Sequence, residues 1–231
     1  MDYHIKFSKF NKLFWPFTAL CLFLFFSCAQ NPVDIAQSEL CLVFEYADEE
    51  SLPSARLSAF VESESDVRRR KELEITSGNE GYVWASEDLI RIKKGDKNWA
   101  GYTNFVMQKN EPFPSGSYRI VIRNADQKEV DEIIDFEYDS EFYELTAEEA
   151  AKKMQENKGI KKVAVYDENN LLLFYDIQSD KYDSARKIWN TYSNASYFNV
   201  IWQTADGFVV CILPKQLVKP ESDVMIEKKE Q

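Results

Sequence analysis

The sequence predicts a β-rich fold with two domains: an antiparallel β-sandwich over residues 39–140, followed by a small α+β unit over residues 141–214. Short runs of alternating apolar and polar residues recur between turn-forming residues up to Tyr138, and this period is typical of strands. After Phe142 the pattern changes to helices that alternate with hairpins. The remaining parts are interpreted as an export signal (1–27), a tether (28–38) and a disordered charged tail (215–231).

The first domain contains eight segments with the length and alternation of strands. In the segment 56–62, for example, Leu57, Ala59 and Val61 share one face, opposite Ser58, Phe60 and Glu62. Strands that follow one another without intervening helices favour an antiparallel sandwich or barrel. The predicted strands are 40–46, 56–62, 72–76, 81–85, 89–93, 102–108, 117–123 and 129–138.

The segment 113–122 resembles the P-x-G-x-Y start of a strand in many immunoglobulin-like and fibronectin-like domains. Pro114 and Gly116 favour a tight corner there. The resemblance implies an immunoglobulin-like sandwich in which Tyr118 buries its ring and returns its hydroxyl to nearby backbone.

The second domain begins with a helix, because Thr146 and Glu149 have the spacing of a capping box and Gly159 follows the expected end near Asn157. We expect a second helix from Ser179 or Asp180 to about Ser193. Together with two hairpins, this order predicts a four-stranded antiparallel sheet covered on one face by two helices. The hairpin strands are 161–166 with 171–175, and 198–204 with 208–213.

The first 27 residues have the layout of an export signal. A polar start carrying Lys6, Lys9 and Lys12 precedes the apolar run 13–26. That run is shorter than the ~20 residues a helix needs to cross a bilayer, and Pro16 lies inside it. We therefore expect a cleaved signal rather than a membrane span.

The residues Leu24-Phe25-Phe26-Ser27-Cys28 resemble the lipobox of bacterial lipoproteins, in the relaxed form of spirochaete-type sequences. The resemblance implies cleavage before Cys28, a diacylglycerol on its sulfur, and a further acyl chain such as palmitate on the new amino terminus. Several acyl chains anchor a protein stably, because each buried methylene contributes ~0.8 kcal/mol. Ala29 after the cysteine implies the outer membrane, on its periplasmic face or its surface.

Charge and histidine content exclude several function classes. The net charge is −11, and removal of residues 1–27, with three lysines and Asp2, leaves −13, which disfavours nucleic-acid binding. The single histidine is His4. A mature chain without imidazole has no histidine-dependent nucleophile and no histidine-ligated metal, so we expect no cofactor and no metal site.

Cys41 and Cys211 would be the remaining cysteines after processing, apart from the lipidated Cys28. They lie in apolar segments at opposite ends of the folded region. Two interpretations stay open: separate buried thiols, which we favour, or a disulfide between the first and last strands in an oxidising compartment.

Two groups of residues are candidates for ligand binding. Arg68, Arg69 and Arg70, with Lys71, form the only basic run and could hold a phosphate, an anionic glycan or a lipid headgroup, although such runs are more often solvated. Trp99 and Tyr102 could offer ring faces to a sugar, with Asn104 close by for its hydroxyls, although core packing is the usual role of tryptophan.

We therefore expect a membrane-anchored lipoprotein of the cell envelope that acts as a non-catalytic interaction or structural module, with a protein or an envelope glycan as partner. One alternative is a glycan-binding module centred on Trp99 and Tyr102. The other is a glycosidase that uses two carboxylates, since acidic residues are numerous, but their separation in space cannot be obtained from sequence.

Overall fold

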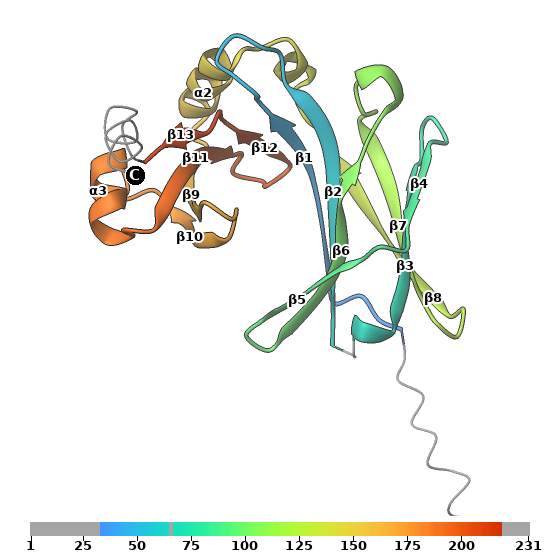
Figure 1. The fold of residues 1–231 in the computed structure, drawn as a ribbon. Coiled ribbons are helices and arrows are strands. Elements are labelled where there is room, and N and C mark those ends of the chain that lie inside the picture. The colour runs from blue at the N-terminus through green and yellow to red at the C-terminus, as the bar shows by residue number, and fades with distance from the viewer. Residues whose placement is uncertain (1–32, 65–66, 219–231) are drawn as a thin grey trace, which may run out of the picture. The chain divides into compact units, whose positions relative to one another are not determined.

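Two sheets, one of nine strands and one of four, dominate the computed structural model, which describes residues 33–64 and 67–218 (Figure 1). Two α-helices accompany them in the described residues. The predicted β-rich fold class is confirmed. The predicted signal and residues 28–32 of the predicted tether, Cys28 among them, lie outside the described residues, as does the tail from residue 219.

All eight strands predicted for the first domain are present. The strand β6 begins five residues earlier than predicted, because Lys94 pairs with Lys97 across a tight turn at Gly95 and Asp96. Gly95 has a φ of 61°, which glycine adopts without strain. The strands are β1 (Gln37–Glu45), β2 (Ser54–Ser63), β3 (Arg70–Ser77), β4 (Val83–Ser86), β5 (Ile90–Lys94), β6 (Lys97–Phe105), β7 (Gly116–Asn124) and β8 (Glu129–Phe136).

The second half follows the predicted order of helix, hairpin, helix, hairpin. The capping box is confirmed, since the Thr146 backbone N–H donates to Glu149 Oε2 at 2.9 Å. The second helix is shorter than predicted: Ser184 is extended, and Tyr182 packs on Phe174 with ring centroids 4.1 Å apart, so the preceding segment is a loop. The elements are α2 (Ala147–Glu156), β9 (Ile160–Asp167), β10 (Leu172–Ile177), α3 (Ala185–Thr191), β11 (Ala195–Gln203), β12 (Val209–Ile212) and β13 (Gln216–Leu217).

The nine-stranded sheet joins strands from both halves of the chain in the order β10-β9-β11-β12-β1-β2-β6-β5, with β13 beside β11. The four strands β10, β9, β11 and β12 are antiparallel, as predicted for the second unit. However, β12 then pairs with β1 in parallel, placing Leu42 opposite Val209 and Phe44 opposite Cys211. The chain on either side of the predicted boundary at residues 140 and 141 therefore shares one sheet.

The four-stranded antiparallel sheet, β4-β3-β7-β8, shares the buried core with the larger sheet. Fully buried side chains such as Leu57 and Val61 come from β2, and Leu73, Ile75 and Ile120 come from β3 and β7. The predicted corner at Tyr118 is confirmed: its ring is buried, and its hydroxyl donates to the Pro114 carbonyl oxygen at 2.6 Å.

Both helices contact β11, and each buries a small apolar group. Ala150 and Met154 of α2 are buried, as is Ile188 of α3. Neither helix of the described residues has the length and apolarity that crossing a bilayer requires. Beyond β13, Val218 is buried and its N–H donates to the Ser196 carbonyl oxygen, so the predicted tail is still packed at residues 216–218.

Candidate functional site

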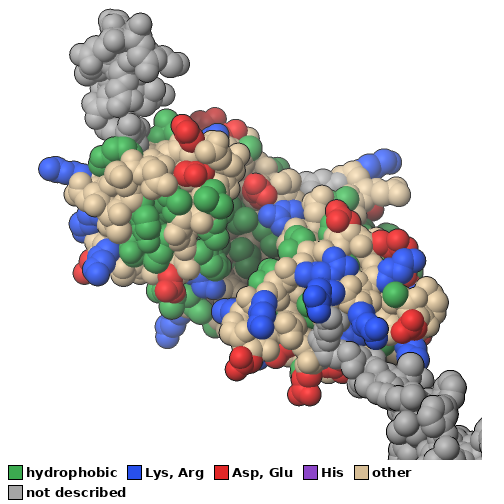
Figure 2. Space-filling view, turned by 60° about the horizontal axis from the view of Figure 1, so that its bottom comes forward, with side chains coloured by type: hydrophobic (Ala, Val, Ile, Leu, Met, Phe, Trp, Pro, Cys, Tyr) green, Lys and Arg blue, Asp and Glu red, His purple; other side chains and the backbone are tan. Residues whose placement is uncertain are grey.

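A groove of about 780 Å³ lies on one face of the nine-stranded sheet, and Figure 2 shows a hollow bordered by hydrophobic side chains. Ile92 of β5 and Tyr175 of β10 both line it, although these strands are at opposite ends of the strand order. Such a shared cavity requires that the sheet curls toward this face. We call this cavity the inner groove; it is lined by Gln37, Glu39, Phe60, Ile92, Lys94, Gly95, Lys97, Trp99 and Tyr175.

Strand alternation explains why these side chains face the groove. Glu39 lies opposite Phe60, and Phe60 opposite Gly101, in neighbouring strands of the sheet. In the next row, Trp99 lies between Glu62 and Ile92. The residues between these rows, such as Val61 and Ala100, point into the sandwich core and are fully buried. The sheet is therefore apolar on both faces at β2 and β6.

Gly101 is required by the packing on the floor of the groove. A Cβ atom at this position would lie 2.4 Å from two carbons of the Phe60 ring and 2.2 Å from the Ala59 carbonyl oxygen. The ring of Phe60 therefore lies directly against the β6 backbone, which only a glycine permits.

Lysine side chains border the aromatic residues of the groove. Lys97 Nζ lies 2.6 Å from Glu62 Oε2 and 6.0 Å from the ring centre of Trp99. On the β10 side, Lys162 Nζ lies 5.5 Å from the ring centre of Tyr175. About half of the Tyr175 and Ile92 surface remains accessible, at 50% and 46%. The groove thus combines accessible apolar walls with cationic borders.

The structure separates the aromatic residues that the sequence placed together. Trp99 lines the inner groove. Tyr102, three residues along the same strand, faces the opposite side and packs on the core, with its ring centroid 4.9 Å from that of Phe105. Asn104 is exposed near the end of β6 and is not among the residues lining the groove. Trp99 and Tyr102 therefore do not form one platform.

The predicted basic run also divides. Arg68 and Arg69 are exposed on a short 3₁₀ turn, Val67–Arg69. Arg70 is buried, and its guanidinium donates to Asp34 Oδ1 at 2.8 Å and to Ser63 Oγ at 2.6 Å. Because Arg70 joins Asp34 to Ser63 of β2 and is not available to a ligand, the three arginines do not form a single anion site.

Cys41 and Cys211 are both free thiols, so the disulfide alternative does not match this structure. Cys211 pairs with Phe44, three residues from Cys41 along β1, which implies about 10 Å between the two cysteine Cα atoms. A disulfide needs less than about 7 Å. Burial raises the pKa of Cys41 to about 11 and that of Cys211 to about 12.

Sequence reasoning missed Phe60, Ile92 and Tyr175 as groove residues. For Phe60 the sequence holds one signal. Phe60 lies on the strand face opposite that of Leu57 and Val61, and on that face the alternation predicts a polar residue. No comparable signal exists for Tyr175, because only the curl of the sheet brings β10 to the groove.

Five carboxyl groups have a pKa below the usual value. Hydrogen bonds or ion pairs lower the pKa of Asp48, Asp131, Asp139, Glu149 and Asp183, whereas a general acid needs a raised pKa. Within residues 33–64 and 67–218, no group of three or more histidine, cysteine or acidic residues could hold a metal ion.

Comparison with protein-family models, curated proteins and solved structures found no match to this chain.

Proposed function

We propose that this chain is a lipid-anchored protein of the bacterial envelope, and that its body is a non-catalytic binding module whose partner occupies the inner groove. The partner is a protein segment or an envelope polymer with an apolar surface. The observation that carries the proposal is the groove itself: the two ends of one sheet place Phe60, Ile92, Trp99 and Tyr175 around one accessible cavity.

Two features of the groove favour binding over a purely structural role. Its volume of about 780 Å³ lies within the range of ligand sites, roughly 300–1,000 Å³. Its side chains Ile92 and Tyr175 remain accessible, whereas on the opposite face of β2 and β6 the side chains of Val61 and Ala100 are buried. Accessible aromatic residues are typical of interaction surfaces.

The groove also supports the glycan alternative in a changed form. Trp99 could still stack on a sugar, but its aromatic neighbours would be Phe60 and Tyr175 rather than Tyr102. Glu39 and Gln37 would then provide the polar contacts. A glycan polymer is thus one of the partners that the experiment below distinguishes.

The anchor is tested by intact mass of the protein purified from bacterial membranes. We expect a mass that lacks residues 1–27 and carries acyl groups on Cys28 and its amino terminus. A Cys28→Ala variant should appear in the soluble fraction. An unprocessed, non-acylated mass would refute the anchored form.

The groove is tested by photo-cross-linking in intact envelopes. A photoreactive side chain is placed at Ile92 or at Tyr175 in the full chain, and the matched control is Ile133, an apolar residue of β8 that is 66% exposed. We expect the same adduct from positions 92 and 175, its loss with Trp99→Ala, and no such adduct from position 133. Digestion with protease or with glycan hydrolases then distinguishes a protein from a glycan.

Equal adducts from all three positions, or adducts that Trp99→Ala leaves unchanged, would contradict a specific site in the inner groove.

A further inference from the structure

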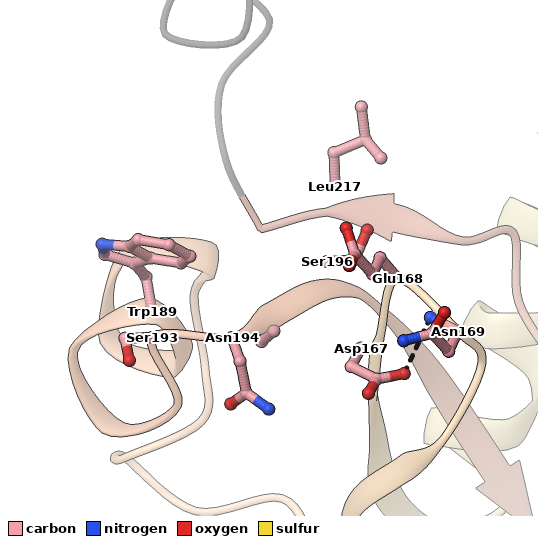
Figure 3. Close-up of a pocket in the computed structure, with 9 residues that line it drawn as sticks. Asp167, Glu168, Asn169, Trp189, Ser193, Asn194, Ser196 and Leu217 are labelled. Carbon is pink, nitrogen blue, oxygen red and sulfur yellow. Dashed lines mark hydrogen bonds between the residues drawn. The ribbon is translucent and has the colours of Figure 1, made fainter. Parts of the chain in front are cut away.

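A second cavity, separate from the inner groove, lies between the turn that joins β9 to β10 and the end of α3 (Figure 3). Its volume is about 380 Å³, and residues at the start of β11 and in β13 complete its wall. We call it the hairpin pocket. The residues that matter for its chemistry are Asp167, Glu168, Asn169, Trp189, Ser193 and Asn194.

Asp167 is held rigidly by its own turn. Its Oδ1 atom accepts hydrogen bonds from the backbone N–H groups of Asn169 and Leu171, at 2.9 and 2.8 Å. The other carboxylate oxygen, Oδ2, takes part in neither bond and is free to accept from a ligand. The turn is braced further along, where the Tyr197 hydroxyl donates to Asn170 Oδ1 at 2.9 Å. The acceptor is thus preorganised.

Trp189 forms the wall of the pocket on the α3 side. The ring is half-buried and packs partly on the core, while the preceding residue, Ile188, is fully buried and fixes the helix. Figure 3 shows the Trp189 ring on one side of the cavity and Asp167 on the other, with the Asn194 side chain between them. An aromatic surface therefore borders a space that contains hydrogen-bonding groups.

This combination matches the chemistry of a carbohydrate. The C–H groups of a sugar ring pack on an indole, and its hydroxyls both donate and accept hydrogen bonds. Asn169, Asn194 and Ser193 supply donors and acceptors, and the Asp167 carboxylate supplies a strong acceptor. A volume of about 380 Å³ suits one or two sugar rings.

The charge of the pocket restricts which sugar it can take. Asp167 and Glu168 line it, and among the described residues no lysine or arginine does. Uronic acids and sulfated sugars would meet like charge in a small cavity, which is unfavourable. An amino group on the sugar would gain a charge-assisted hydrogen bond and could lie against the indole face.

We propose that the hairpin pocket binds a neutral or amino-bearing saccharide unit, stacked on Trp189 and hydrogen-bonded by Asp167, Asn169 and Asn194. This site is additional to the inner groove, and its chemistry does not depend on what occupies that groove.

The proposal is tested by titration calorimetry with the full chain in a polyoxyethylene detergent, which contains no sugar. The probes are an N-acetylglucosamine tetramer, the matching glucosamine tetramer and a galacturonate tetramer. We expect the first two to bind with a Kd of about 1 mM or below and the galacturonate tetramer not to bind.

Variants identify the site. Asn194→Ala should raise the Kd for the neutral tetramer about tenfold, since Asn194 is exposed and its loss removes one hydrogen bond to ligand. Trp189→Phe should weaken binding by a smaller factor because a smaller ring remains. The control is Asp206→Asn. Asp206 accepts a backbone hydrogen bond in the β11–β12 turn, as Asp167 does in the β9–β10 turn, but it lies outside this pocket. This variant should leave the Kd unchanged.

Urea unfolding of each variant confirms that Asn194→Ala is folded before it is titrated. No binding of the first two tetramers up to ~10 mM would overturn the proposal. So would equal binding of the galacturonate tetramer, or an unchanged Kd in both Asn194→Ala and Trp189→Phe.

Discussion

Replacing Gly101 by alanine tests the packing that forms the floor of the inner groove. The added methyl would lie 2.2 Å from the Ala59 carbonyl oxygen and 2.4 Å from two carbons of the Phe60 ring. The ring can turn away, but the carbonyl oxygen belongs to the backbone of β2, which pairs with β6 at this point. The two strands must therefore separate locally.

The cost of such overpacking is typically about 1–3 kcal/mol. The loss of glycine flexibility in the unfolded chain offsets about 0.4–1 kcal/mol of this. We expect Gly101→Ala to lower the free energy of unfolding by about 1–2 kcal/mol and the Tm by roughly 2–8 °C. The displaced Phe60 ring should also reduce the photo-cross-linking yield from position 92.

The assay is urea unfolding at neutral pH, followed by circular dichroism, with Phe60→Ala and the double variant completing a thermodynamic cycle. Phe60→Ala removes the ring contact but leaves the contact with the Ala59 oxygen, so the double variant should recover only part of the loss. A Gly101→Ala protein that is as stable as the wild type would refute the close approach of β2 and β6 at this position.

Three further changes probe the rest of the fold. Tyr118→Phe should cost about 1–2 kcal/mol in urea unfolding, because it leaves the Pro114 carbonyl oxygen without the buried hydroxyl donor; an unchanged midpoint would argue against the corner. Asp34→Ala should lower the free energy of unfolding by about 2 kcal/mol or more, because the buried Arg70 loses its carboxylate partner. Glu45→Ala removes a partner of the more exposed Arg56 and should lower it by less than half as much. Stability should also fall at alkaline pH. Below about pH 8 the thiols of Cys41 and Cys211 are protonated in both the folded and the unfolded chain. Above this pH the unfolded chain loses these protons first, because in the folded chain the pKa of Cys41 is about 11 and that of Cys211 is about 12. Above pH 8 each thiol therefore lowers the free energy of unfolding by up to about 1.4 kcal/mol per pH unit. Cys211→Ala should make the free energy of unfolding fall less steeply between pH 9 and 11; an equally steep fall would contradict the burial of this thiol.

The strands, the Tyr118 corner and the capping box could be predicted because each depends on residues close together in sequence. Alternation locates β2, and Pro114 and Gly116 determine the corner that Tyr118 closes. The second helix was extended too far because Ser179 and Asp180 are good caps, whereas the contact of Tyr182 with Phe174 is a tertiary effect.

The sites could be predicted only in part, since they depend on contacts between distant segments. Trp99 was a candidate from its type and position, but its separation from Tyr102 required knowing the register of β6. The parallel pairing of β1 with β12 has no local signal, yet it joins the two halves into the sheet that carries the inner groove.

The most direct test of the inner groove is a chemical bridge across it. Ile92→Cys and Tyr175→Cys are combined in the full chain, and a short bismaleimide is added at neutral pH, where Cys41 and Cys211 remain protonated and slow to react. We predict that the bridge forms within one molecule, and that it prevents partner cross-linking from a photoreactive side chain at position 99. The control is the pair Ile133→Cys and Tyr175→Cys. A bridging yield for the 92–175 pair that is no higher than the yield for this control would contradict a sheet that curls to bring β5 and β10 around one groove.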